Sequence, residues 1–406
     1  MESDSIIADI IAFSNLHQSG VRDVLKNSRF FEPIFPIHLE YVKKGKKQDN
    51  LQLLIQLDEL NNRIESVIPK IKQNRITIDY LKFAIRQVQF TLHKNIFRIN
   101  LSHFMKNEEE VTTSEIKKGI QDLIEKATLL KTEYIVLWNQ ENREHWLEKN
   151  IQKFDEFIES LANLEGYCVI SPSITISEKG REIAMKSLFG DLPVYYSTEK
   201  DAVESSFIKY VEPIFCNSDV SIKARVINKD KAFEINECNL IYHKAIGKLH
   251  TLNAKYSKYH PSYDGGGTYA LLDGKQGTAD ALLSGKWQGY AGQNIDIEID
   301  LERSQSINYF SMGFYQNTRS WVIFPKKIEI YVKDSISDSY KLIKIIDNTI
   351  PPEAEGSLKH IYETKFTNLK VRYVKVIAHY YGKLPEWHHA GSNYESMIFS
   401  DEIILK

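Results

Sequence analysis

Apolar residues recur every three or four positions through the first 164 residues of the chain, the spacing that gives a helix one hydrophobic face. The four clearest runs cover residues 51–68, 78–104, 113–137 and 146–164. At the third run, Thr113 and Ser114 can cap a helix, and Glu115 follows them. Short links join these runs, and Pro and Gly are scarce among them. The pattern predicts a helical bundle over residues 1–164.

Near Gly166 the pattern changes to short runs rich in β-branched and aromatic residues, separated by Gly, Pro, Asn and Asp. These runs cover residues 168–170, 173–176, 194–196 and 221–227. In the last of them Ile222, Ala224 and Val226 alternate with polar residues, so they share one face of a strand. The segment 165–246 is therefore predicted to be a small all-β domain.

Residues 247–406 alternate in the same way and over more strands. The run Ile295 to Asp300 reads IDIEID, a half-buried antiparallel strand, and it follows three consecutive glycines (265–267) and a turn at Asp273-Gly274. Further strands are predicted at residues 295–301, 307–314, 327–333, 340–345, 371–379 and 398–405. Regular strands with turn signals between them predict a β-sandwich or jelly roll. The fold class is thus multidomain, α followed by all-β.

Composition narrows the function classes. The formal net charge is −2, which argues against a nucleic-acid surface because such a surface needs a basic excess. The three cysteines (Cys168, Cys216 and Cys238) lack CxxC spacing, so we expect neither a zinc site nor a redox motif. No apolar run approaches the roughly 20 residues of a transmembrane helix. The N-terminal stretch MESDSIIADIIAF shows no signal peptide pattern.

Candidate catalytic groups are few. Adjacent acids occur at Asp58-Glu59, Asp155-Glu156 and Asp401-Glu402, but none stands where a glycosidase active site would need paired carboxylates across a cleft. The motifs GxSxG, HExxH and the P-loop are missing from the sequence. His388 and His389 are adjacent, so on a strand they would point to opposite sides. We therefore expect no catalytic residues in this chain.

A calcium site is a candidate in the turn Asp273 to Thr278, which reads DGKQGT. It offers a carboxylate, several turn carbonyls and a hydroxyl, the hard oxygen ligands that Ca²⁺ prefers. Glu402 is placed to close the site, because the first and last strands of a sandwich are often neighbours. The alternative is a plain turn that Thr278 caps.

Sugar binding is the third candidate. Trp287, Trp321 and Trp387 each lie beside glycine, proline or a strand end, and aromatic faces on loops stack on sugars. The side chains that could bind hydroxyl groups nearby are Arg319, His388 and Asn393. The alternative is that these tryptophans belong to the core of the sandwich.

The C-terminal residues also show a family resemblance. Segments 265–301, 311–332 and 384–405 resemble the discoidin-like (coagulation factor 5/8 type C) domain found at the C terminus of many bacterial family 20 glycoside hydrolases, the β-N-acetylhexosaminidases. They are also similar to family 32 carbohydrate-binding modules. Residues 187–228, with the run Tyr195 to Thr198, resemble the fibronectin-III-associated chitobiase C-terminal domain. Residues 133–161 resemble the helical region that follows the catalytic barrel in those enzymes.

The resemblance implies a non-catalytic, glycan-binding half of such an enzyme, because no position matches the Asp-Glu pair of the barrel. It implies structural calcium at Asp273, Thr278 and Glu402, with Lys275 standing where Asn or Asp is common. Terminal N-acetylhexosamine or galactose is the expected partner. The alternatives are an active hexosaminidase whose barrel lies outside this chain, and a purely structural or protein-interaction module. The family is usually exported.

Overall fold

The computed structural model describes most of the chain as two compact units, residues 1–165 and 166–406. The described residues are Ile34 and the ranges 46–71, 75–106, 111–143, 145–257, 263–280 and 284–406, together with residues 73, 259 and 282. The helical prediction for residues 1–45 lies outside them, apart from Ile34. Each unit is considered by itself below.

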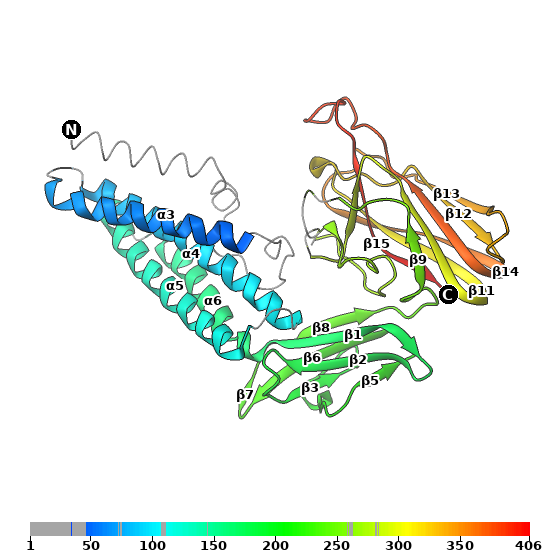
Figure 1. The fold of residues 1–406 in the computed structure, drawn as a ribbon, viewed down its shortest axis with the longest axis horizontal. Coiled ribbons are helices and arrows are strands. Elements are labelled where there is room, and N and C mark those ends of the chain that lie inside the picture. The colour runs from blue at the N-terminus through cyan, green and yellow to red at the C-terminus, as the bar shows by residue number, and fades with distance from the viewer. Residues whose placement is uncertain are drawn as a thin grey trace. The chain divides into compact units, whose positions relative to one another are not determined.

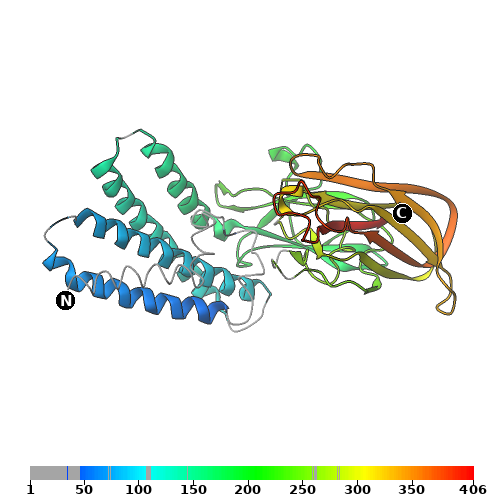
Figure 2. The ribbon, with the colours of Figure 1, turned by 90° about the horizontal axis from the view of Figure 1, so that it is seen from above.

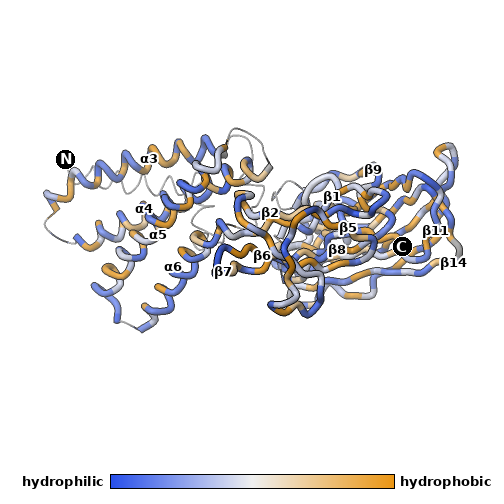
Figure 3. The backbone as a smooth tube through the Cα atoms, turned by 90° about the horizontal axis from the view of Figure 1, so that it is seen from below, coloured by the Kyte–Doolittle hydropathy of each residue, from blue (hydrophilic) through white to orange (hydrophobic). Residues whose placement is uncertain are grey.

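The first unit contains four long helices in the part that the structure describes. They are α3 (Lys46–Val67), α4 (Arg75–Lys106), α5 (Thr113–Glu141) and α6 (Leu147–Ala162). Helices adjacent in sequence pack against each other, which confirms the predicted bundle (Figures 1 and 2). Hydrophobic residues recur along each helix (Figure 3), and Leu57 and Leu60 of α3 meet Ile85 and Val88 of α4 in a buried core. None of the described helices has the length and apolarity needed to cross a membrane.

The cap of α5 differs from the sequence prediction by one residue. Thr112, not Thr113 or Ser114, is the N-cap: its hydroxyl accepts a hydrogen bond from the Glu115 amide at 3.2 Å. The Glu115 carboxylate in turn accepts from the Thr112 amide at 2.8 Å. This reciprocal arrangement is a capping box, and it needs the acid three residues after the cap, which selects Thr112.

The second unit begins with a small β-sandwich. One sheet has the strand order β1-β2-β5, and the other β4-β3-β6-β7, with β8 paired to β6. The strands are β1 (Cys168–Ser177), β2 (Gly180–Ser187), β3 (Val194–Ser197), β4 (Ile208–Lys209), β5 (Ile214–Cys216), β6 (Val220–Asn228), β7 (Lys231–Ala232) and β8 (Asn236–Leu240). Ile222, Ala224 and Val226 are fully buried on one face of β6, as predicted.

A larger sandwich follows, built from one seven-stranded sheet with the order β10-β15-β11-β14-β12-β13 and β9 paired to β11. Its strands are β9 (Leu249–Leu252), β10 (Gln288–Ala291), β11 (Ile295–Gln316), β12 (Lys327–Lys333), β13 (Lys341–Asp347), β14 (Leu358–His379) and β15 (Met397–Leu405). The predicted fold class, helices followed by antiparallel β-sandwiches, is confirmed.

Two strands of 22 residues, β11 and β14, run through both layers of the larger sandwich. Their first and second halves have different neighbours: residues 297–300 of β11 pair with β9, and residues 310–315 pair with β15. Register shifts between Asp300 and Gln305 mark where the sheet bends back on itself. Residues of both layers, among them Ile297 and Phe310, form one buried core.

Candidate functional site

A cleft at one end of the larger sandwich brings three of the predicted sugar contacts together. The cleft has a volume of about 740 Å³ and lies between three segments. It is lined by Asn317, Thr318, Arg319, Pro352, Glu353, Ala354, Glu355, Gly356, Trp387, His388 and His389. Arg319, Trp387 and His388 are therefore neighbours in space, although almost 70 residues separate the first from the other two.

Hydrogen bonds join the first two segments of the cleft wall. Thr318 Oγ1 donates to the carbonyl of Pro352 at 2.6 Å, and Gln316 Nε2 donates to the carbonyl of Pro351 at 3.1 Å. Asn317 Nδ2 lies 3.1 Å from Ser357 Oγ, at the other end of the loop. Because side chains of the 316–318 turn hold both ends of the 351–357 loop, this wall of the cleft is pre-formed.

His388 fixes the third segment. Its ring is buried, and Nε2 donates to the carbonyl of Thr318 at 2.7 Å. Nδ1 accepts from the amide of Ala390 at 3.1 Å, which corresponds to the neutral Nε2–H tautomer. Both ring nitrogens are thus committed to the backbone, so His388 positions the wall instead of offering a donor to a ligand.

Trp387 supplies the aromatic surface of the cleft. Its side chain is 54% exposed, although it lies beside the buried His388. Arg319 and His389 are exposed, and so are Glu353 and Glu355 on the 351–357 loop. The cleft thus combines a solvent-facing indole with one guanidinium, two carboxylates and an imidazole. That set can stack on an apolar ring face and bind several hydroxyl groups.

Two further predicted contacts lie outside the lining of this cleft. Trp321 is half-buried, and its ring centroid is 5.0 Å from that of Tyr394. Its φ of 69° places it in the left-handed region, at the end of the short 3₁₀ turn Thr318–Ser320. Asn393 is exposed on the loop before β15. Both belong to the segments that form the cleft, but neither lines it.

Trp287 is a correction to the sequence prediction, because it is a core residue with no exposed surface. Its indole Nε1 donates to the carbonyl of Thr278 at 3.2 Å, and its ring centroid lies 5.5 Å from that of Tyr315. A Cβ on Gly277 would stand 2.2 Å from the indole. The missing side chain of Gly277 therefore allows the backbone to pack against the indole, and the ring is not available to a surface ligand.

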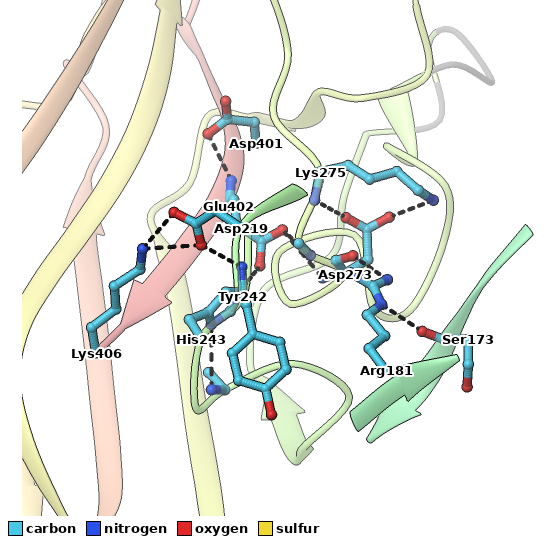
Figure 4. A network of polar contacts seen from close by, with 12 residues as sticks. Ser173, Arg181, Asp219, Tyr242, His243, Asp273, Lys275, Asp401, Glu402 and Lys406 are labelled. Atoms are coloured by element: carbon cyan, nitrogen blue, oxygen red, sulfur yellow. Dashed lines mark hydrogen bonds and ion pairs between the residues drawn. The ribbon is translucent and has the colours of Figure 1, made fainter. Parts of the chain in front are cut away.

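Two of the three residues predicted to bind calcium, Asp273 and Glu402, accept hydrogen bonds from nitrogen donors (Figure 4). Glu402 Oε2 accepts from the amides of Asp273 and Gly274 at 3.1 and 2.9 Å, and Oε1 lies 2.8 Å from His243 Nε2. The Asp273 carboxylate accepts from the Lys275 amide at 2.9 Å and from its Nζ at 3.0 Å.

Thr278 turns to a different partner. Its side chain bonds the carboxylate of Asp280, which lowers the pKa of Asp280. Within the described ranges, no group of three or more His, Cys, Asp or Glu side chains is arranged to hold a metal ion. Calcium binding at this loop stays a prediction.

Burial governs the ionisation of this cluster. Desolvation raises the pKa of Glu402 well above its usual range, and the nearby charge of Asp273 adds to the effect. Desolvation also lowers the pKa of His243 to about 3, followed in size by repulsion from Arg181. A neutral His243 donating to Glu402 is consistent with both shifts. The cluster is a buried polar network instead of a solvent-open binding site.

The sequence reasoning missed the 351–357 loop. Glu353 and Glu355 face the cleft, yet the run PPEAEGS contains no aromatic residue, the signal from which the other candidates were chosen. The sequence predicts His388 and His389 on a strand, and it offers only His388 as a sugar contact. The structure places both in a turn, so one ring is buried and the other lines the cleft.

Comparisons with known proteins were made by sequence and by structure. No protein-family model matches the chain, and neither does any curated protein. The structure is similar to chitosan-binding module 1 of a chitosanase/glucanase from Paenibacillus sp. IK-5, at 14% identity and a TM-score of 0.26, over 41% of this chain and 98% of that chain. A fucose-binding module of Streptococcus pneumoniae gives the same values.

The lectin domain of lectinolysin, complexed with Lewis B antigen, also matches, at 14% identity and a TM-score of 0.25, over 40% of this chain and 95% of that chain. Identities and TM-scores in this range carry no conclusion about function. The function proposed next therefore rests on the cleft itself.

Proposed function

We propose that the cleft of the larger sandwich binds a sugar and that this chain acts as a non-catalytic glycan-binding protein. The observation that carries the proposal is the exposed Trp387 on the wall of a pre-formed cleft, with Arg319, Glu353 and Glu355 around it. A large aromatic ring that stays exposed while its neighbour His388 is buried leaves an apolar surface free for a ligand.

The side chains of the cleft contribute to sugar binding in two ways. The indole stacks on the C–H face of a pyranose, while charged groups form hydrogen bonds to the hydroxyl groups at the ring edge. One exposed aromatic ring in an open cleft buries little of a ligand. We therefore expect weak binding to a single sugar, with a free energy of about −4 kcal/mol and a dissociation constant near 1 mM.

The class of sugar is a finer proposal. The resemblance of segments 265–301, 311–332 and 384–405 to the modules of β-N-acetylhexosaminidases supports terminal N-acetylhexosamine or galactose as the ligand. On the same support, the chain is an accessory region that positions glycans containing amino sugars. The same resemblance implies calcium at Asp273, Thr278 and Glu402, and the calcium titration of the next subsection decides between that ion and a cation of the chain itself.

The test is a glycan-array screen of the full chain, followed by titration of the best sugar. Trp387→Ala should lower the affinity at least tenfold, because it removes the stacking surface. Trp146→Ala is the matched control: Trp146 is also exposed, at 57%, but it belongs to the helical unit. Equal affinity in the two variants, or a folded wild-type chain that binds no glycan, would contradict the proposal.

A catalytic role is tested with the same protein and a chromogenic N-acetylglucosaminide. We expect no release of chromophore from the wild-type chain. Release that disappears in Glu353→Gln or Glu355→Gln, but persists in Trp146→Ala, would make the cleft an active site and overturn the non-catalytic proposal.

A further inference from the structure

Arg181 crosses from the small β-sandwich into the loop predicted to bind calcium. It lies on β2, in the sheet β1-β2-β5, and its residue is only 1% exposed. Its Nε donates to the carbonyl of Ser173 on β1 at 2.7 Å. Its Nη2 donates to the carbonyl of Asp273 at 2.7 Å (Figure 4). A calcium loop would use such a turn carbonyl as a metal ligand, whereas here the carbonyl binds a guanidinium.

Gly274 makes room for this guanidinium. A Cβ on Gly274 would stand 2.5 Å from Arg181 Nη1, and its φ of 71° already favours glycine. The amide of Gly274 donates to Glu402, and its carbonyl accepts from the amide of Ile241 at 2.9 Å. The guanidinium is therefore inserted against the same peptide units that hold the Glu402 carboxylate.

Three acids in this region each pair with a lysine of the chain. Asp273 pairs with Lys275 at 3.0 Å, Asp401 with Lys359 at 2.9 Å, and Asp219 with Lys406 at 2.8 Å. Burial lowers the pKa of Arg181, and the charges of Asp273 and Glu402 act against this shift. Asp273 and Asp401 already hold a lysine each, and Glu402 accepts from two amides, so a divalent ion would have to displace these donors.

We propose that the Arg181 guanidinium is the built-in cation of the 273–278 loop, and that it joins the small β-sandwich to the larger one without calcium. The loop keeps the turn glycines of a calcium loop, but its carboxylates and its Asp273 carbonyl are directed to nitrogen donors of the chain itself. This inference is independent of the sugar proposal, because it concerns a buried junction and not the cleft.

The first test is the response of the full-length wild-type protein to calcium. Thermal unfolding is followed after treatment with EDTA and again after addition of millimolar calcium chloride, and calcium binding is titrated calorimetrically. We expect the midpoint of the β unit to be unchanged and no heat of binding. A midpoint that falls with EDTA and is restored by calcium would overturn the proposal.

The second test removes the cation. Arg181→Met should lower the unfolding midpoint by roughly 10 °C, because it leaves the carbonyls of Ser173 and Asp273 without the guanidinium that donates to them. It should also speed proteolysis of the connection at residues 241–248 at least tenfold. Arg225→Met is the matched control: Arg225 is also buried, at 7% exposure, but it pairs with Glu204 inside the small sandwich.

The two variants distinguish a junction from a merely structural arginine. If the connection resists protease equally well in both, Arg181 does not join the sandwiches and the proposal fails. Should Arg181→Met not fold, Arg181→Lys replaces it in the test. Lysine retains the positive charge but lacks the planar guanidinium that donates to two carbonyls at once. Arg181→Lys should fold, and its connection should be cleaved faster than that of the wild type or Arg225→Met but more slowly than a connection that is no longer held. Cleavage of Arg181→Lys at the wild-type rate, with calcium stabilising the wild type, would reject the proposal.

Discussion

Two adjacent residues, Trp387 and His388, have different roles in the cleft. Trp387 is 54% exposed, whereas His388 is 4% exposed and uses both ring nitrogens on backbone groups of the wall. Without this ring the Thr318 carbonyl retains the Trp321 amide as a donor at 2.8 Å, but the Ala390 amide loses the acceptor that Nδ1 provides, and an unsatisfied donor costs about 1–3 kcal/mol. The position of the exposed indole therefore depends on its buried neighbour.

This dependence predicts the effect of His388→Ala. The substitution should lower the free energy of unfolding by about 1–3 kcal/mol and weaken sugar binding, because the 385–391 segment loses its tie to Thr318. Hydrogen exchange should rise at the amides of residues 385–391. His389→Ala, in the exposed neighbour, should leave that exchange unchanged. A variant of His388 whose exchange pattern matches that of His389→Ala would show that the ring does not position the wall.

The sequence could not separate Trp287 from Trp387, and the reason lies far from both in the chain. Each tryptophan stands in a polar run with turn residues close by. What buries Trp287 is the approach of Gly277 and the pairing of β10 with β15, more than 100 residues later. Such contacts between distant segments leave no local mark. Arg319 and Trp387, which the sequence places on polar and aromatic turns, both line the cleft, because exposed turns do carry a local signal.

At the scale of elements, the long periodic segments were predictable and the junctions between them were not. The four helices follow their hydrophobic period, and the core strands follow alternation. The stretch from Glu302 to Ser306 reads ERSQS, which resembles a turn, so β11 was predicted as two strands. The structure continues the strand through a bulge, with Glu302 at a φ of 68° and Arg372 bonded to both oxygens of Asp300.

Strand β12 carries a buried acid whose ionisation stabilises the sheet. Glu329 is 8% exposed and accepts from Lys327 and Tyr331 of its own strand, and His379 Nε2 on β14 lies 3.0 Å from its carboxylate. The hydrogen bond from Lys327, followed by that from His379, lowers the pKa of Glu329 from 4.5 to about 2. Because the pKa is lowered on folding, the stabilisation is complete above pH 4.5 and disappears as the pH falls toward 2.

We therefore expect Glu329→Gln to lose less unfolding free energy than the wild type as the pH falls. Between pH 6 and pH 3 the wild type should lose about 2 kcal/mol more unfolding free energy than Glu329→Gln does. Urea unfolding at the two pH values gives this difference directly. Glu302→Gln is the control, since the Glu302 side chain is 58% exposed and pairs with Lys248 at the surface. Equal acid sensitivity in wild type and Glu329→Gln would contradict the assignment of the low pKa.

At the scale of the whole molecule, each unit has its own hydrophobic core. Leu57 and Ile85 belong to the core of the helical unit, and Ile297 and Phe310 to that of the larger sandwich. The small sandwich has a further core around Ile222, and Arg181 bonds it to the larger sandwich within the β unit. Separate cores predict separate folding transitions, because cooperativity follows shared buried surface.

Calorimetry of the full chain should accordingly show two unfolding transitions, and a bound sugar should move only that of the β unit. A sugar at 100 times its dissociation constant adds about 2.7 kcal/mol, which shifts a unit of this size by roughly 5–10 °C. Thr112→Ala identifies the other transition, because loss of the α5 cap should cost the helical unit about 1 kcal/mol. In Trp387→Ala the sugar-dependent shift should vanish while both transitions remain. A single transition, or a sugar that moves both, would show that the two units fold as one.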